Sequence, residues 1–331
     1  MSTYQSTVVR LPARLLRAAR TLLDESGQYE DLSELLVVAL ENQLALESDS
    51  GKSGLEGGLF GDFAQGPHER DTTEALLALT TEMPGDLAEP APTHQPLFVL
   101  TNRLSPIPFV ARILVNLTLN GGPPDWRTFG EASADLARRV GSRVATEDAE
   151  SGVPRSLSRA VGWPVGENAE KAKRRFRRSF VTGEGNSSAP LQELGIAVLG
   201  RDSRVRLTRD GVTLALAPNP LIGEEHEGEG TMSPEQRTQL RHLLRSGSKG
   251  ELEEVQTFVE AVADGRSQES VDAVIRSRHP AWTENHIQAH RAALVGRLRE
   301  LDVVLVDGRG GDAWMSPGPA ANEFKAIKGA S

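Results

Sequence analysis

The sequence predicts a mainly α-helical chain in which short strands follow or precede the helices. Leucine and alanine recur at helical spacing in several stretches, for example over 13–26 and 294–301. Capping residues open many of these stretches, which is typical of helix N-termini. Two later stretches, around 192–207 and 298–315, pass from a helix into a hairpin of short strands. We therefore expect three folded modules, with a linker after the first.

The first module, residues 1–47, is predicted to form one strand and two helices. Residues 6–11 are rich in β-forming side chains, and Pro12 ends the strand while suiting the first turn of a helix over 13–26. A capping box at 31–34 opens the second helix. A lone strand leaves its N–H and C=O groups unpaired, and so short a module cannot build its own core. We therefore expect this module to pair with a second copy of itself.

These residues carry a resemblance to a known family. Val8-Val9-Arg10-Leu11-Pro12, Gly27-x-Tyr29 and Ser33-Glu34-Leu35-Leu36-x-x-Ala39-Leu40 are similar to the ribbon-helix-helix family of DNA-binding proteins, over residues 3–47. The resemblance implies a homodimer whose two strands enter the major groove of double-stranded DNA. On such a ribbon Ser6, Val8 and Arg10 would face the bases, and backbone N–H groups near Ser33 would bind a phosphate. Glu30 and Asp31 would oppose that phosphate, so dimerisation without DNA binding stays an alternative.

Residues 48–96 are rich in Gly, Ser, Pro, Asp and Glu, which predicts a flexible acidic linker with one short helix after the capping box at 71–74. Gly51-Lys52-Ser53 is similar to the end of a phosphate-binding loop. Leu46 stands where that motif needs its first glycine, so we expect no nucleotide site.

Charge is unevenly distributed along the chain. The formal net charge is −9, yet residues 96–222 carry 18 basic and 12 acidic side chains, a net charge of +6. The surplus is concentrated on a predicted helix over 168–180, with no acid between Lys171 and Phe180. Its basic residues are Lys171, Lys173, Arg174, Arg175, Arg177 and Arg178. Such a cluster predicts a helix that contacts DNA phosphates, and the alternative is a solvated charged face.

The two later modules share one pattern. In residues 97–222 we expect helices over 109–119, 129–140 and 168–180 and a hairpin around 200–203. In residues 223–331 we expect helices over 251–263, 268–277 and 283–301 and a hairpin around 307–312. Three helices followed by a hairpin resemble a winged-helix domain, so the predicted fold is a ribbon-helix-helix followed by two winged-helix-like domains. Winged-helix domains bind DNA or dock proteins, and the fold alone does not decide between these two functions.

Catalytic and metal-binding motifs are not found. The chain has no cysteine, which excludes disulfides, a thiol nucleophile and cysteine-bound metals. His286 and His290 have the spacing of an H-E-x-x-H zinc motif, but Asn285 and Ile287 flank His286 where the glutamate should stand. We interpret these histidines as a polar helix face, and we expect the four dispersed tryptophans to pack in cores or interfaces. We expect no enzyme activity, cofactor or metal.

The sequence thus predicts a sequence-selective DNA-binding homodimer that regulates transcription. The alternative is a non-enzymatic scaffold subunit, in which the first module dimerises and the winged-helix-like domains dock protein partners. No apolar run is long enough to cross a bilayer, and residues 1–10 are polar. We therefore expect a cytoplasmic protein without a membrane partner, associated with the nucleoid if it binds DNA.

Overall fold

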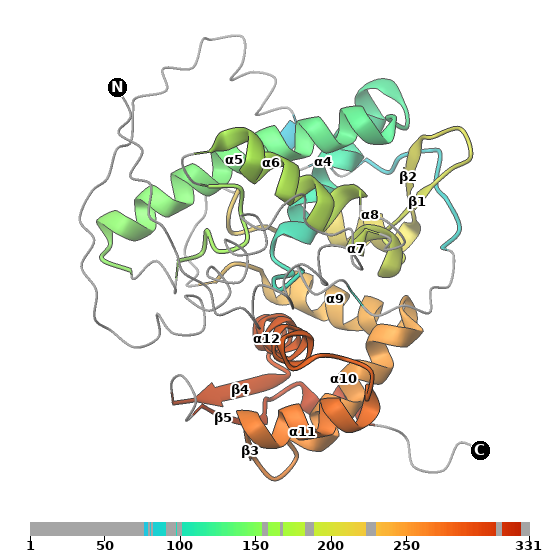
Figure 1. The fold of residues 1–331 in the computed structure, drawn as a ribbon. Coiled ribbons are helices and arrows are strands. Elements are labelled where there is room, and N and C mark those ends of the chain that lie inside the picture. The colour runs from blue at the N-terminus through green and yellow to red at the C-terminus, as the bar shows by residue number, and fades with distance from the viewer. Residues whose placement is uncertain are drawn as a thin grey trace, which may run out of the picture. The chain divides into compact units, whose positions relative to one another are not determined.

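The structure is a computed structural model of the chain. It describes residues 76–90 except 79 and 81, residue 97, and the ranges 101–153, 158–165, 168–182, 189–222, 230–308 and 313–325. By its internal contacts the chain divides into two units, Met1–Ala45 and Leu46–Ser331, and every described residue belongs to the second. The predicted ribbon-helix-helix module lies outside the described residues, as does the capping box at 71–74. The prediction of a mainly helical chain is confirmed (Figure 1).

Two helices form the centre of the first half. Helix α4 (Pro106–Gly121) has a proline at its first position, and its stretch from Ile107 to Val115 is buried throughout. Helix α5 (Trp126–Glu150) begins at Asp125, whose carboxylate accepts hydrogen bonds from the backbone N–H groups of the next turn. It is longer at both ends than the predicted 129–140, because this cap starts it earlier and alanine and valine continue its buried face.

The remaining elements of this half follow in order. They are α6 (Ala169–Arg177), a π-helical turn η2 (Arg178–Thr182), α7 (Pro190–Glu193), the antiparallel strands β1 (Ala197–Leu199) and β2 (Val205–Leu207), and α8 (Arg209–Leu216). The predicted hairpin is confirmed, whereas α8 was not predicted. Arg112 of α4 stabilises the C-terminal end of α8, because its buried guanidinium donates to the carbonyl oxygens of Ala215 and Ala217.

The second half contains the predicted helices and a small sheet. Its elements are α9 (Pro234–Ser246), α10 (Lys249–Ala261), β3 (Arg266–Ser267), α11 (Gln268–Arg278), α12 (Glu284–Glu300), β4 (Val304–Asp307), β5 (Trp314–Pro317) and the 3-10 turn η4 (Ala321–Phe324). The strands pair in the order β3-β5-β4, all antiparallel. The structure confirms the three helices predicted here, each to within two residues at both ends. It also confirms the predicted hairpin, whose strands are β4 and β5. Helix α9 and the two-residue strand β3 were not predicted.

A buried ion pair of the second half is hydrogen-bonded to the backbone of the first half. Arg297 of α12 and Glu251 of α10 lie 2.8 Å apart, with side chains 0% and 1% exposed. Arg297 also donates to the Thr101 carbonyl at 2.7 Å, and Glu251 accepts from the Leu97 N–H at 2.8 Å. Helix α9 adds a second connection, because it contacts both α8 and α10 (Figure 1).

Two further contacts hold the C-terminal part of α12 against the residues before α4. The Glu300 carboxylate accepts hydrogen bonds from the backbone N–H groups of Leu104 and Ser105 and from the Ser105 hydroxyl, so it caps α4 from another helix. Burial raises the pKa of Glu300. Gly296 lies so close to the Asn102 carbonyl oxygen that a Cβ at this position would overlap it. Helix α12 therefore forms part of both halves.

Part of the predicted linker contacts the folded core. Leu76 and Leu77 are helical and pack against it, and the Asn116 amide donates to the carbonyls of Leu76 and Ala78. Further along, the Ala88 N–H donates to the Leu207 carbonyl of β2. These described residues are ordered by hydrogen bonds to the central helices and the hairpin.

Replacing Arg297 alone should be strongly destabilising, because it leaves Glu251 as a buried anion without its cation. We expect R297M to lower the free energy of unfolding by about 3–5 kcal/mol. R297M/E251Q should recover part of this loss, since glutamine is uncharged and can still accept from Leu97. Chemical denaturation of the full chain measures both. A double variant no more stable than R297M would contradict the assignment of the cost to the unpaired charge.

Candidate nucleic-acid interface

The predicted DNA-contacting residues fall in two groups. Ser6, Val8, Arg10 and Ser33 lie outside the described residues. The six basic residues lie on α6 and the first position of η2, and all six are half-buried. The basic helix therefore lies within the described residues, and the predicted ribbon lies outside them.

Local sequence explains where α6 begins. The Asn168 side chain caps the helix by accepting from the Lys171 N–H at 3.1 Å. Glu170 lies in the first turn and arginines lie in the last turn, which is the arrangement that the helix dipole favours. Phe176 is the buried residue of α6, and the basic side chains surround it on the rest of the helix.

A row of aromatic rings attaches α6 to the core. Phe176 lies 4.9 Å from Phe180 and 6.4 Å from Trp163, and Trp163 lies 4.8 Å from Phe109 of α4, all between ring centroids. Gly141 of α5 leaves room for Trp163, because a Cβ there would lie 2.7 Å from the Trp163 Cβ. Aromatic burial of this kind contributes most of the packing energy of a small helix. Apolar contacts with the core therefore fix the position of the basic helix.

Ion pairs join the sides of α6 to α5. Lys173 lies 2.7 Å from Asp135 and 3.2 Å from Glu170, and Arg177 lies 3.9 Å from Glu131. The hydrogen bond to Asp135 raises the pKa of Lys173. These acids are themselves half-exposed or more, so each pair is weak. The solvated-face interpretation is too simple, because the charges of α6 are part of a helix–helix contact.

The acids do not neutralise this surface. Together α5, α6 and η2 hold 10 basic and 6 acidic residues, a net charge of +4. Arg138, Arg139 and Arg143 of α5 contribute to it. An arginine in an ion pair keeps further N–H donors, since its guanidinium has five. We refer to α5, α6 and η2 together as the basic face.

The second half presents a different surface. Residues 223–331 carry a net charge of −5. The C-terminal part of α12 is covered by residues 101–105, as described above. Some exposed charged side chains of this half form ion pairs, for example Arg276 with Glu284 at 2.7 Å. This half offers no concentration of positive charge among its described residues.

One sequence expectation in this half is wrong. His290 does not lie on a polar surface: it is 1% exposed and its Nε2 lies 3.2 Å from Glu254 of α10. Its burial depends on the packing of α12 on α10, two helices that are distant in the sequence. Of the tryptophans, Trp126 is 42% and Trp314 49% exposed, so for these two the expected packing in an interface stays a prediction.

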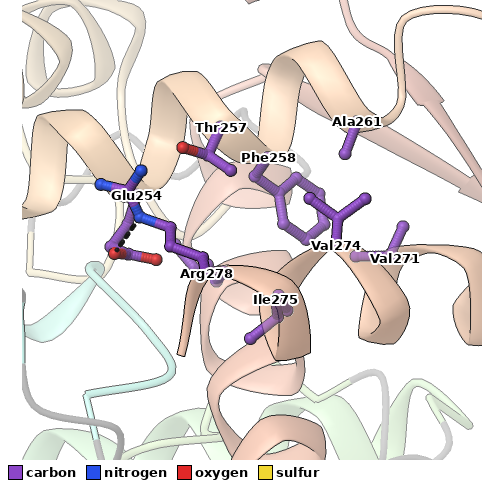
Figure 2. A pocket seen from close by; sticks show the side chains of 9 residues that line it. Glu254, Thr257, Phe258, Ala261, Val271, Val274, Ile275 and Arg278 are labelled. Carbon is purple, nitrogen blue, oxygen red and sulfur yellow. Dashed lines mark hydrogen bonds and ion pairs between the residues drawn. The ribbon is translucent and has the colours of Figure 1, made fainter. Parts of the chain in front are cut away.

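An open hollow of about 360 Å³ lies between α8 and α9, and a much smaller cavity lies in the second half. The cavity between α10 and α11, next to the Glu254–Arg278 ion pair, has room for about one water molecule (Figure 2). No group of three or more His, Cys, Asp or Glu side chains among the described residues could hold a metal ion. None of the described helices is long and apolar enough to span a membrane.

Comparison with known proteins gives no match. No family model matches the chain, and neither the curated proteins nor the solved structures contain a significantly similar one.

Replacing Phe176 should release α6, whereas removing an ion pair should not. We expect F176A to lower the free energy of unfolding by about 3–5 kcal/mol and to speed trypsin cleavage within 171–178. D135N, which leaves every tryptic site in place, should cost about 0–1 kcal/mol. Chemical denaturation and timed proteolysis measure the two effects. Equal losses in the two variants would mean that charge, not packing, positions α6.

Proposed function

We propose that the chain is a sequence-selective, double-stranded DNA-binding protein that acts as a homodimer and regulates transcription. In this proposal residues 1–47 form a ribbon-helix-helix dimer that reads bases, and the basic face binds the phosphate backbone. The observation that carries it is the net charge of +4 on the basic face in a chain whose total is −9. Phosphate binding depends on such local surplus charge, because it displaces counterions from the DNA.

The architecture of α6 supports this role. A helix attached by Phe176 and Phe180 keeps its basic side chains on a rigid support. Rigid placement lowers the entropy that long side chains lose when they bind a phosphate. Because arginine has several donors, the residues that pair with α5 can still donate to DNA.

The order of elements supports winged-helix-like domains in both halves. The second half runs α10-β3-α11-α12-β4-β5, with β5 between the other two strands. The first half runs α4-α5-α6 and then the β1–β2 hairpin. We assign the winged-helix role to residues 97–222 and 223–331 on this basis.

A second candidate function is a scaffold subunit that docks proteins. The observation that favours it is the contact of α12 with residues 101–105, because α12 is the third helix of the proposed domain and winged-helix proteins commonly use that helix on DNA. The net charge of −5 in this half also opposes contact with phosphates. We therefore assign DNA binding to the first module and the basic face, and leave protein docking to the second half.

Deleting residues 1–50 should convert a dimer into a monomer, because the predicted strand of the first module needs a partner strand. Size-exclusion chromatography with light scattering measures the mass, and the full-length chain is the control. A truncated chain that remains a dimer would place the interface within residues 51–331.

Replacing Arg174, Arg175 and Arg178 by glutamine should weaken binding to genomic DNA fragments mainly at low salt. Loss of about three phosphate contacts should make the slope of log affinity against log salt shallower by roughly 0.9 per contact. The preferred sequence should not change, since phosphate contacts do not distinguish bases. Gel shifts at several salt concentrations measure both quantities.

A matched control removes the same charge from the other half. Arg266, Arg276 and Arg299 are exposed residues of β3, α11 and α12, and their triple glutamine variant should leave the slope unchanged. Thermal unfolding confirms that both triple variants are folded. An unchanged slope in a folded α6 variant would remove the basic face from the DNA interface and favour the docking function.

A further inference from the structure

The turn between α11 and α12 gathers three imidazoles around one indole. The His279 ring lies 3.7 Å from the Trp282 ring at 6°, and the His286 ring lies 4.3 Å from it on a stack tilted by 20°. His290 meets Trp282 edge-on at 5.0 Å. We call these four residues the histidine cluster.

The sequence brings these rings together through the ends of two helices. His279 ends α11, and its carbonyl accepts a hydrogen bond from the Trp282 N–H. Thr283 caps α12 by accepting from the His286 N–H. His286 and His290 are then one helical turn apart and lie on the same side of α12.

A single carboxylate faces the cluster from α10. The Glu254 side chain is 7% exposed and lies 3.1 Å from His279 Nε2 and 3.2 Å from His290 Nε2. It also accepts a hydrogen bond of 3.0 Å from Arg278 Nε, an ion pair that Figure 2 shows at the edge of the small cavity. Glu254 is thus already shared between a guanidinium and two imidazoles.

Three further ion pairs connect other charged groups of these helices. On α10, Glu253 lies 3.3 Å from Arg278. Between α11 and α12, Asp272 lies 2.7 Å from Arg291 and Arg276 lies 2.7 Å from Glu284. No carboxylate among the described residues lies within ion-pair distance of His286. A proton on His286 would therefore have no counter-charge in the closed turn.

The ionisation of the cluster follows from this geometry. Burial lowers the pKa of His286, and the charges of His290 and His279 lower it further. Burial alone would raise the pKa of Glu254, but its hydrogen bond with His290 and its other cationic neighbours lower it to about 2. Glu254 therefore remains an anion at the pH values where histidines gain protons.

We propose that the histidine cluster is a proton-sensitive latch, which holds the α11–α12 turn on α10 at neutral pH and releases it on mild acidification. A proton on His286 adds a charge beside His279, His290 and Arg278, which already share the single carboxylate of Glu254. Repulsion between like charges then opposes the closed turn. The proposal does not depend on DNA binding.

The direction and range of the response follow from proton linkage. His286 binds a proton more weakly in the closed turn, so closure is complete above its ordinary pKa of 6.5 and is lost as the pH falls below that value. Glu254 has a lowered pKa, so its contribution is present above 4.5 and is lost only below it. Release should therefore occur between these two values.

Hydrogen exchange of the full-length chain tests the latch. After correction for intrinsic rates, the opening equilibrium of residues 279–290 should be larger at pH 5.5 than at pH 7.5, by up to about tenfold, because one fully excluded proton gives a factor of about ten per pH unit below its ordinary pKa. Segments of α4 and α5 serve as the internal reference. Equal opening at the two pH values would overturn the proposal.

Two variants and one control separate the latch from general acid instability. H286F keeps an aromatic ring on Trp282 but cannot gain a proton, so it should lose the pH response. E254Q removes the counter-charge of His279 and His290, so it should move release to higher pH. H242Q changes an exposed histidine of α9 and should behave as the unmodified chain. An H286F chain that retains the pH response, or an E254Q chain that opens only at lower pH, would overturn the proposal.

Discussion

The buried Arg297–Glu251 ion pair is the interaction on which the arrangement of the described residues depends. Both charges have lost their water, so each is tolerated only while the other lies against it and while Thr101 and Leu97 complete their hydrogen bonds. A shift of α10, of α12 or of the segment before α4 would break this set. The pair fixes the C-terminal part of α12, whereas the histidine cluster lies at the other end of that helix.

Most helices could be predicted because their signals are local. A run of apolar residues was sufficient for α4, and periodic apolar residues with a local cap were sufficient for α10, α11 and α12. Helix α9 also has such a signal, a capping box at Ser233 and Gln236 with a proline between them, but its polar sequence gives little periodicity. Strand β3 has two residues and is defined by pairing with β5, which no local pattern can specify.

The candidate sites show the same division between local and distant information. The basic residues of α6 lie close together in the sequence, so their clustering was evident. Their partners Glu131 and Asp135 were not, because the pairing arises from the packing of α6 on α5. Likewise, the spacing of His286 and His290 was visible, but the indole that stacks on one and the carboxylate that faces the other come from outside α12. The two histidines were interpreted as a polar helix face, but tertiary packing places them in a partly buried cluster.

The contact between Gly296 and the Asn102 carbonyl has a consequence for dissecting the molecule. An alanine would ordinarily suit a helix interior better than glycine, by about 1 kcal/mol, yet here its methyl group would occupy the space of a backbone oxygen. An alanine at position 296 would thus push α12 away from Asn102, while leaving every charge and hydrogen-bonding group of the chain in place. Gly296 therefore marks where the two halves could be uncoupled without altering the chemistry of either.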